Sequence, residues 1–367
     1  MLAEKRRTPK MTIKTKNETL ADVGAGLCCI IPPYVLDHLA QSSDAKIRQL
    51  AIDAIANSSS MRAVRATLAM MPAMAAIPSP AAKRHRLVYD LKNGEFNALP
   101  GQLIRSEGDP KTQDITENEA YNYAGSTYNF YKSVLGRNSL DDHGMTMISS
   151  VHFGRRYNNA FWTGEQMCYG DGDGQIFIRF TKSVDVVGHE LTHGVVSNTC
   201  NLVYSNESGA LNEHFADVFG TLVKQWRKRQ TVKKGDWLIG AEIMGPGPTA
   251  KALRTFKAEK AYENDALLGT DPQPKHLKNK YTGSADNGGV HINSGIPNHA
   301  FYLTAMEIGG KAWEKAGQIW YKTMLKLTST SQFKDMVQST TESAATLYGN
   351  NSREHKAVMK AWKSVGF

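Results

Sequence analysis

The segment 185–193, DVVGHELTH, constrains this chain more than any other, because it places two histidines four residues apart. On a helix, side chains at that spacing project from one face, so His189 and His193 can hold one metal ion between their rings. Glu190 directly follows His189 and can face a water molecule in the open position of such a metal. The segment therefore predicts a helix with a catalytic zinc site and Glu190 as general base.

A catalytic zinc ion needs a third protein ligand. Glu213 follows His193 at a separation that allows a turn and an antiparallel second helix, and we expect it to be that ligand. Asp217 is one helical turn beyond Glu213, and Asp185 lies on the first helix. Either carboxylate could orient a ligand histidine from behind. We expect Asn212 to lie in the same layer of residues, next to the metal ligands.

Plainer interpretations exist for the same residues. The histidine pair alone also fits a helix with two surface histidines, and Glu213 alone also fits a solvated carboxylate. A site with a third histidine is excluded, because it would need glycine and histidine where the chain has Val196 and Thr199. His214 we interpret as a structural residue.

The N-terminal quarter differs from the rest of the chain. Residues 1–26 are polar, and we expect them to be disordered. Helical spacing of apolar residues predicts a helix over 43–70. Three prolines among small residues in 71–82 indicate an exposed linker that suits proteolytic nicking, so we interpret 1–83 as one separate part.

Beyond this boundary, the pattern predicts a β-rich part over 84–184 and a helical part over 185–367. Strands are predicted at 87–90 and 175–180, with a helix near 116–135. Helices are predicted at 184–197, 208–228, 296–308, 312–328, 333–348 and 353–364. This order is typical of an α+β protein with two lobes and an active-site cleft between them.

Charge and hydropathy narrow the partners. The 44 Lys and Arg residues exceed the 35 Asp and Glu residues by nine, but no nucleic-acid-binding motif is present, so we expect no nucleic-acid partner. No apolar run is long enough for a transmembrane helix, and we expect no membrane partner. The apolar run 27–31 is too short for a secretory signal, so we expect export by a non-classical route, with a cytoplasmic pool as an alternative.

Longer motifs then point to a family. They occupy residues 158–162, 170–174, 185–193, 206–213 and 286–295. With these blocks in order, the chain resembles the thermolysin-like (M4) metallopeptidases from about residue 87 to 367. Within that family it resembles the protealysin-like branch, whose members have short propeptides. The resemblance implies a two-lobed zinc endopeptidase preceded by a propeptide.

The resemblance also implies residue roles. His189, His193 and Glu213 would bind zinc, and Glu190 would be the general base. His291 would hydrogen-bond the oxyanion of the tetrahedral intermediate, Asp286 would hold the ring of His291, and Tyr204 would be the second oxyanion donor. Donors aimed at charge that develops only in the transition state can contribute several kcal/mol to catalysis.

Substrate-binding residues follow from the same resemblance. Asn159 and Ala160 match the edge strand on which substrates add as a further strand, and Arg254 matches the arginine that binds a substrate carbonyl. The pocket for the residue after the cut would be lined by five apolar residues: Phe177, Val186, Ile239, Ile243 and Leu253. We therefore predict cleavage on the N-terminal side of bulky hydrophobic residues.

One departure concerns calcium. Thermolysin has a double calcium site near the zinc helix, and here Asp185 and Asp236 remain at matching positions. The other three carboxylate positions hold Lys224, Leu238 and Ala241. Calcium needs six to eight oxygen ligands, whereas a lysine ammonium could replace one metal charge. We predict that the double calcium site is absent.

The N-terminal part carries Pro32, Pro33 and Tyr34, which resemble a motif that sits against the catalytic cleft in precursors of this branch. We expect a proline-stiffened strand on the edge strand that acts as an inhibitor in cis. Maturation would cut near 75–86.

Several alternatives remain open. Cys28 or Cys29 could block zinc as a thiolate, although we interpret all four cysteines as free thiols, or the N-terminal tail could have no inhibitory role. A non-catalytic zinc-stabilised peptide-binding protein would lack a catalytic group, and none is missing. An exopeptidase would need a group for the free amine, and the aminopeptidase Gly-x-Met-Glu-Asn signature is absent. We expect a monomer acting on proteins and peptides.

Overall fold

The computed structural model describes residues 28–69 and 83–367, so the expectations for 1–26 and for the linker 71–82 lie outside the described residues. A six-stranded sheet has the order β1-β5-β6-β4-β2-β3. Its strands are β1 (Cys28–Cys29), β5 (Ala160–Trp162), β6 (Met167–Tyr169), β4 (Met147–Val151), β2 (Arg86–Asp90) and β3 (Gln102–Ser106). β4 is parallel to β2 and β6, and the other pairs are antiparallel.

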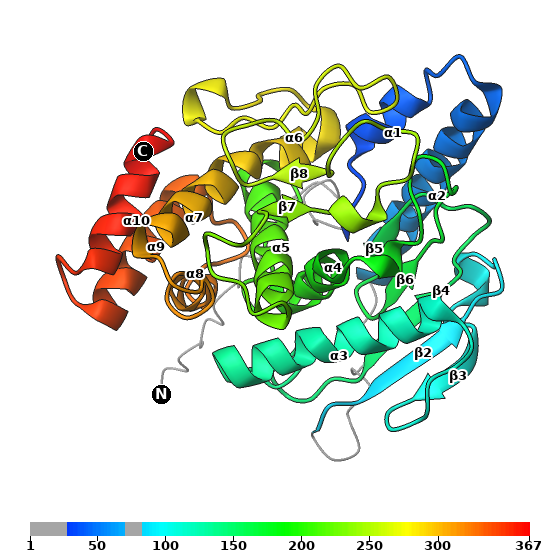
Figure 1. Ribbon diagram of the computed structural model, residues 1–367, viewed down its shortest axis with the longest axis horizontal. Coiled ribbons are helices and arrows are strands. Elements are labelled where there is room, and N and C mark those ends of the chain that lie inside the picture. Colours follow the sequence, from blue (N-terminus) through cyan, green and yellow to red (C-terminus); the bar gives the residue numbers. More distant parts are fainter. Residues whose placement is uncertain (1–27, 70–82) are drawn as a thin grey trace, which may run out of the picture.

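Helix α3 (Ile115–Leu135) packs against β2 and β4 on one side and against helix α4 on the other. The side chain of Asp114 caps its N-terminus by accepting from the backbone N–H groups of Thr116 and Glu117. Gly136 ends the helix with a positive φ of 74°. The helix thus links the sheet to the helical half of the molecule (Figure 1).

Helices α4 (Val184–Ser197) and α5 (Asn206–Arg227) form the centre of the molecule. They can approach closely because glycines face each other at their crossing. A Cβ atom on Gly188 would lie only 3.1 Å from the Cα atom of Gly220. A Cβ atom on Gly220 would lie 2.5 Å from the carbonyl oxygen of Asp185. Larger residues there would force the helices, and the side chains between them, apart.

The remaining elements complete the helical half (Figure 1). They are α6 (Ala285–Asn293), α7 (Gly295–Ile308), α8 (Ala316–Met324), α9 (Phe333–Tyr348) and α10 (Arg353–Ser364), with a short ribbon of β7 (Leu238–Ile239) and β8 (Arg254–Thr255). The predictions for 184–197, 333–348 and 353–364 are confirmed. No helix in the described ranges is both long and apolar enough to cross a membrane.

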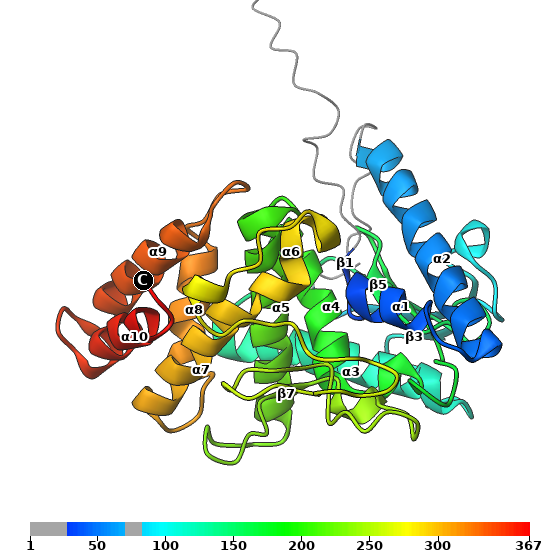
Figure 2. The same ribbon diagram turned by 90° about the horizontal axis from the view of Figure 1, so that it is seen from above.

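The N-terminal part forms β1, α1 (Pro33–Leu39) and α2 (Ala45–Ala69), and Figure 2 shows β1 beside β5. The helix predicted over 43–70 is confirmed. The strand expected at Pro32-Pro33-Tyr34 is wrong, because the paired residues are Cys28 and Cys29, and Pro33 begins a helix. A proline suits the first helical turn, where its missing N–H would have no partner.

The strand predicted at 175–180 is also wrong, and only an isolated bridge at Phe177 remains. The cause is Asp173, whose Oδ1 atom accepts from the backbone N–H groups of Gln175, Ile176 and Phe177. A side chain that satisfies three successive donors holds the backbone in a turn, in competition with a strand ladder.

Candidate active site and metal centre

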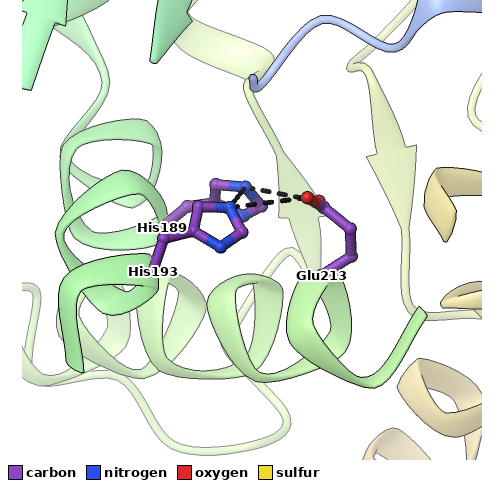
Figure 3. A group of neighbouring side chains, drawn as sticks. All are labelled: His189, His193 and Glu213. Carbon is purple, nitrogen blue, oxygen red and sulfur yellow. Dashed lines mark hydrogen bonds and ion pairs between the residues drawn. The ribbon is translucent and has the colours of Figure 1, made fainter. Parts of the chain in front are cut away.

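Three metal-binding side chains meet between α4 and α5. The Nε2 atoms of His189 and His193 lie 3.1 Å apart, and each lies 3.5 Å from a carboxylate oxygen of Glu213. All three side chains are fully buried. Figure 3 shows both rings and the carboxylate pointing toward one another. The predicted ligand set is therefore brought together by the fold.

The outer nitrogens of both rings face side-chain oxygens. His193 Nδ1 lies 2.8 Å from Asn212 Oδ1, and His189 Nδ1 lies 2.9 Å from Asp217 Oδ1. These partners keep the protons on Nδ1, so the Nε2 lone pairs face the centre of the group. Burial lowers the pKa of His193 to about 3, which favours the neutral imidazole that metals bind.

The charge and polarity of this group fit a zinc ion. One oxygen of Glu213 and both carboxylate oxygens of Glu190 are buried without a hydrogen-bond partner. Buried polar atoms are almost always satisfied, so carboxylate oxygens without a hydrogen bond beside two oriented imidazoles fit the binding of a cation. Two histidines and one glutamate also form a ligand set of catalytic zinc sites.

A chain of hydrogen bonds supports this centre from behind. Asp217 accepts from the guanidinium of Arg254, with the closest contact at 2.9 Å, and from Asn298 Nδ2 at 2.9 Å. His214 Nδ1 donates to Asn298 Oδ1 at 2.7 Å, while its Nε2 accepts from Trp320 Nε1 at 2.7 Å. Burial lowers the pKa of His214 to about 4, in agreement with this neutral form. His214 is thus structural, as predicted, whereas Asn298 had no signal in the sequence.

Asp185 does not join the zinc ligands, contrary to the prediction that it could orient a ligand histidine. Its carboxylate lies 2.8 Å from Lys224 Nζ and accepts from Ser183 Oγ. Lys224 Nζ also lies 2.8 Å from Asp236 and donates to the Leu238 carbonyl at 2.6 Å. The ammonium group therefore sits between the two aspartates that match calcium ligands in thermolysin.

The proposed catalytic groups converge on the same point. Glu190 is fully buried, and burial raises its pKa well above the usual range. Tyr204 Oη donates to Glu213 and lies 3.2 Å from His291 Nε2. His291 Nδ1 lies 2.6 Å from Asp286 Oδ1, and its backbone N–H donates to Asp286 Oδ2 at 2.8 Å.

An unusual turn brings Asp286 to His291. Asp286, Asn287, Gly288 and Gly289 all have positive φ angles, of 54°, 51°, 82° and 81°. Two of the four are glycines, which adopt this region readily, and asparagine and aspartate tolerate it better than other residues. The turn explains the glycines of the 286–295 motif, because it places the carboxylate against the imidazole.

The first strand of the chain occupies the cleft as a peptide would. β1 pairs antiparallel with β5, and the Ile30 N–H donates to the carbonyl of Ala160 at 3.2 Å. The Ile30 carbonyl accepts from Arg254 Nη1 at 3.0 Å. Ala160 and Arg254, two of the predicted substrate-binding residues, thus bind the backbone of one residue.

The neighbours of Ile30 extend this pattern. The Ile31 N–H donates to Asn159 Oδ1 at 3.0 Å, and the Cys29 carbonyl oxygen lies 3.0 Å from His291 Nε2. Cys29 thus presents its carbonyl to His291, and its thiol is not among the grouped metal ligands of the described residues. The side chain of Cys28 lies outside the described residues.

Ile30 is fully buried, and it belongs to the same hydrophobic cluster as the five predicted pocket residues. Those residues are Phe177, Val186, Ile239, Ile243 and Leu253, each at most 1% exposed. Sequence reasoning missed the role of residues 29–31, whose apolar run was interpreted only as too short for a signal sequence. Residues 29–31 are buried within this cluster, which accounts for the apolar run.

Comparison with known proteins agrees with this geometry. The family model for the thermolysin metallopeptidase catalytic domain matches residues 80–197, and that for the alpha-helical domain matches residues 200–367. The chain is 41% identical over 347 residues to an extracellular metalloprotease of Pectobacterium carotovorum subsp. carotovorum, covering 93% of this chain and 96% of that protein. It is 48% identical over 287 residues to Protease PrtS of Photorhabdus sp. (strain Az29), covering 77% and 76%.

A solved structure is similar over nearly the whole chain. It is the precursor of protealysin, a metalloproteinase from Serratia proteamaculans, with a TM-score of 0.82 and 41% identity, covering 92% of this chain and 99% of that chain. That protein, like this one, includes the part that precedes the catalytic lobes. The chain therefore belongs to the thermolysin family of zinc metalloendopeptidases, in its protealysin-like branch, and is the zymogen form that still carries its propeptide.

Proposed function

We propose that His189, His193 and Glu213 hold the catalytic zinc, and that Glu190, His291 and Tyr204 carry out the chemistry around it. Zinc bound there would polarise the scissile carbonyl and lower the pKa of a water molecule. Asn212 and Asp217 support the proposal, because each fixes the tautomer and direction of one ligand histidine.

Glu190 takes the proton from the attacking water and passes it to the leaving amine. Its buried position and raised pKa suit a group that must be protonated midway through the reaction. His291 and Tyr204 donate to the oxyanion that replaces the scissile carbonyl oxygen. Their polar atoms lie 3.2 Å apart, and Nε2 of His291 is already 3.0 Å from the Cys29 carbonyl oxygen, which stands in for a substrate carbonyl.

The contacts of residues 29–31 carry the proposal for substrate binding and for inhibition. Ile30 occupies the position of the residue after the cut, with its N–H on Ala160 and its carbonyl on Arg254. The bond between Cys29 and Ile30 then lies where a scissile bond lies. A buried isoleucine in this pocket supports a preference for Leu, Phe or Ile after the cut.

The propeptide would inhibit in cis by filling these subsites, and its removal would need a cut in the linker. Arg84 and Arg86 both pair with Glu107, at 3.1 and 2.5 Å, and Arg86 begins β2. A cut beyond Arg84 would remove an arginine that pairs with Glu107 next to this strand. We therefore propose that the maturation cut falls within residues 75–83, a narrower range than the predicted 75–86. The propeptide and linker would then be residues 1–83, followed by the β-rich lobe over 84–184 and the helical lobe over 185–367.

We also propose that the double calcium site is absent. Lys224 is 2% exposed and its ammonium lies between Asp185 and Asp236, so it offsets one of the two carboxylate charges. Leu238 offers a backbone carbonyl to this lysine. The extracellular metalloprotease of Pectobacterium carotovorum supports action outside the cell. The monomeric state stays a prediction from the sequence.

The test changes the residue that fills the pocket. In the full-length chain, Ile30→Asp places a charge in an apolar pocket, and Ile52→Asp makes the same change at a site that is 45% exposed on α2. We expect Ile30→Asp to cleave a short Leu-containing peptide before any change in chain length, and Ile52→Asp to stay latent like the wild type. If both variants remain equally latent, residues 29–31 do not inhibit the enzyme.

A further inference from the structure

A second group of metal-binding side chains lies on the β-rich half, outside the catalytic centre. One ligand atom from each of Asp114, Glu117 and His152 lies within 4.8 Å of the others. Asp114 caps helix α3, Glu117 lies in its first turn, and His152 directly follows strand β4. Two carboxylates and an imidazole therefore meet where a helix begins and a strand ends.

The imidazole of His152 is held in the orientation that metal-binding histidines adopt. Its Nδ1 lies 2.8 Å from Asp171 Oδ2, which leaves Nε2 facing Asp114 Oδ2 at 3.6 Å. A carboxylate behind the outer ring nitrogen is the arrangement that orients histidine ligands, and Asp217 does the same for His189 in the catalytic centre. The backbone of His152 also has a positive φ of 56°, a conformation that residues other than glycine rarely adopt.

The carboxylate of Glu117 is the observation that points to a ligand. Glu117 is only 9% exposed, yet among the described residues its carboxylate has no hydrogen bond and no ion pair. The Oδ1 atom of Asp171 is buried without a hydrogen bond, and a buried carboxylate oxygen without a partner is costly. Within residues 28–69 and 83–367, no lysine or arginine forms an ion pair with Asp114, Glu117 or Asp171.

We propose that Asp114 Oδ2, Glu117 and His152 Nε2 form a second metal site for a divalent transition-metal ion such as Zn²⁺. An imidazole nitrogen with two carboxylate oxygens suits zinc and its neighbours, whereas calcium takes oxygen ligands. The ion would tie the end of β4 to the start of α3, and Asp171 would connect it to the loop after β6. It would have a structural role, because no catalytic group lies in this cluster.

The test counts metal ions and does not depend on activity. Full-length chains with Glu190→Ala, which removes the proposed general base, are dialysed against micromolar Zn²⁺ and their metal content is measured. We expect two zinc ions per chain, and one after a further His152→Ala change. His143→Ala is the matched control, because His143 is an exposed loop histidine without a carboxylate partner in the described chain, and it should keep two ions.

Two further variants make the result decisive. Asp171→Asn leaves the three ligands in place and should weaken the second site by about 10–100-fold. His189→Ala should remove the catalytic ion and leave the second one, which separates this proposal from the assignment of the catalytic ligands. Should His152→Ala fail to fold, Glu117→Gln replaces it, since the amide keeps the size of the side chain. One ion per chain in the Glu190→Ala protein, or two ions regardless of His152 and Glu117, would overturn the proposal.

Discussion

Two charge centres lie along the same pair of helices, α4 and α5, and they balance their charge differently. The proposed zinc-binding group, His189, His193 and Glu213, includes a carboxylate oxygen that has no hydrogen-bond partner. The second centre contains Asp185, Asp236 and the ammonium of Lys224, which lies 2.8 Å from both carboxylates. The first centre needs a metal, and the second carries its own cation.

The difference follows from chemistry at each position. A catalytic centre needs a metal ion with one open coordination position, so the protein supplies only three ligands and leaves the fourth position for water or substrate. A structural centre needs only neutralisation, which a lysine supplies when its desolvation is offset by close carboxylates. Near Lys224, burial lowers the lysine pKa but Asp185 and Asp236 outweigh this effect, so the net pKa is raised and the ammonium stays charged.

The largest effect should come from removing the internal cation. Lys224→Met leaves Asp185, which is 1% exposed, without its partner, and we expect unfolding to become easier by about 3–5 kcal/mol. Denaturant unfolding of the Glu190→Ala chain measures this. Lys228→Met removes an exposed pair with Glu242 and should change stability by less than about 1 kcal/mol. Similar values for both variants would mean that Lys224 does not balance a buried charge.

A large effect on rate alone is expected at the catalytic centre. His291→Ala removes an oxyanion donor and should lower kcat/KM of the matured enzyme by about 100- to 1,000-fold. Zinc content should not change, because His291 is not a ligand. His299→Ala serves as control, since that ring hydrogen-bonds a backbone carbonyl and stacks on Tyr302, outside the proposed catalytic groups. A loss of zinc in His291→Ala would show instead that the residue helps to hold the metal.

A smaller effect tests whether the two centres are independent. Asn212→Ala removes the acceptor behind His193, so zinc affinity should fall by about 10–100-fold in a competition assay with a chelator. Lys224→Met should leave that affinity unchanged, provided the protein is folded under the conditions of the assay. An equal loss of affinity in both variants would show that the centres are coupled through the helix pair.

The pH dependence of catalysis reports on His291. Burial lowers the pKa of His291, but the charges of Glu213 and Asp286 raise it by more, so the net pKa is about 9. Nε2 donates only while the ring is protonated, so kcat/KM should hold above the usual histidine pKa of about 6.5 and fall as pH rises through about 9. Asp286→Asn removes one raising charge and should move this limb to lower pH. A limb that stays in place would exclude His291 as its origin.

The smallest expected effect concerns calcium. With Lys224 in place, adding calcium or a calcium-selective chelator should not change the melting temperature, because a ligand stabilises only where it binds. Thermal unfolding of the Glu190→Ala chain measures this without self-digestion. A calcium-dependent increase of several degrees in the parent chain would show that Asp185 and Asp236 still hold the ion.

The zinc centre could be predicted from the sequence because its signals are local or lie in long motifs. His189 and His193 share one helix face, and the helix itself follows from apolar periodicity. The path of residues 28–31 could not be predicted in the same way. Their hydrogen bonds join positions far apart in the chain, such as Ile31 and Asn159, and a short apolar run does not specify which groove it fills.

The errors have equally specific causes. The strand at 175–180 failed because Asp173 satisfies three backbone donors, which no apolar pattern reveals. Asp185 was assigned to a ligand histidine because helix position alone does not fix the partner of a carboxylate. Lys224, identified from the comparison with calcium ligands, is that partner.

The most direct test of the central claim follows the full-length chain and its Glu190→Ala form over time, by band size and by casein hydrolysis. We expect the wild type to lose its N-terminal part at a cut within 75–83 and to gain activity that a zinc chelator removes, while Glu190→Ala stays full length and inactive. If neither form hydrolyses casein even after another protease cuts the linker, the zinc centre is not catalytic, and the account is contradicted.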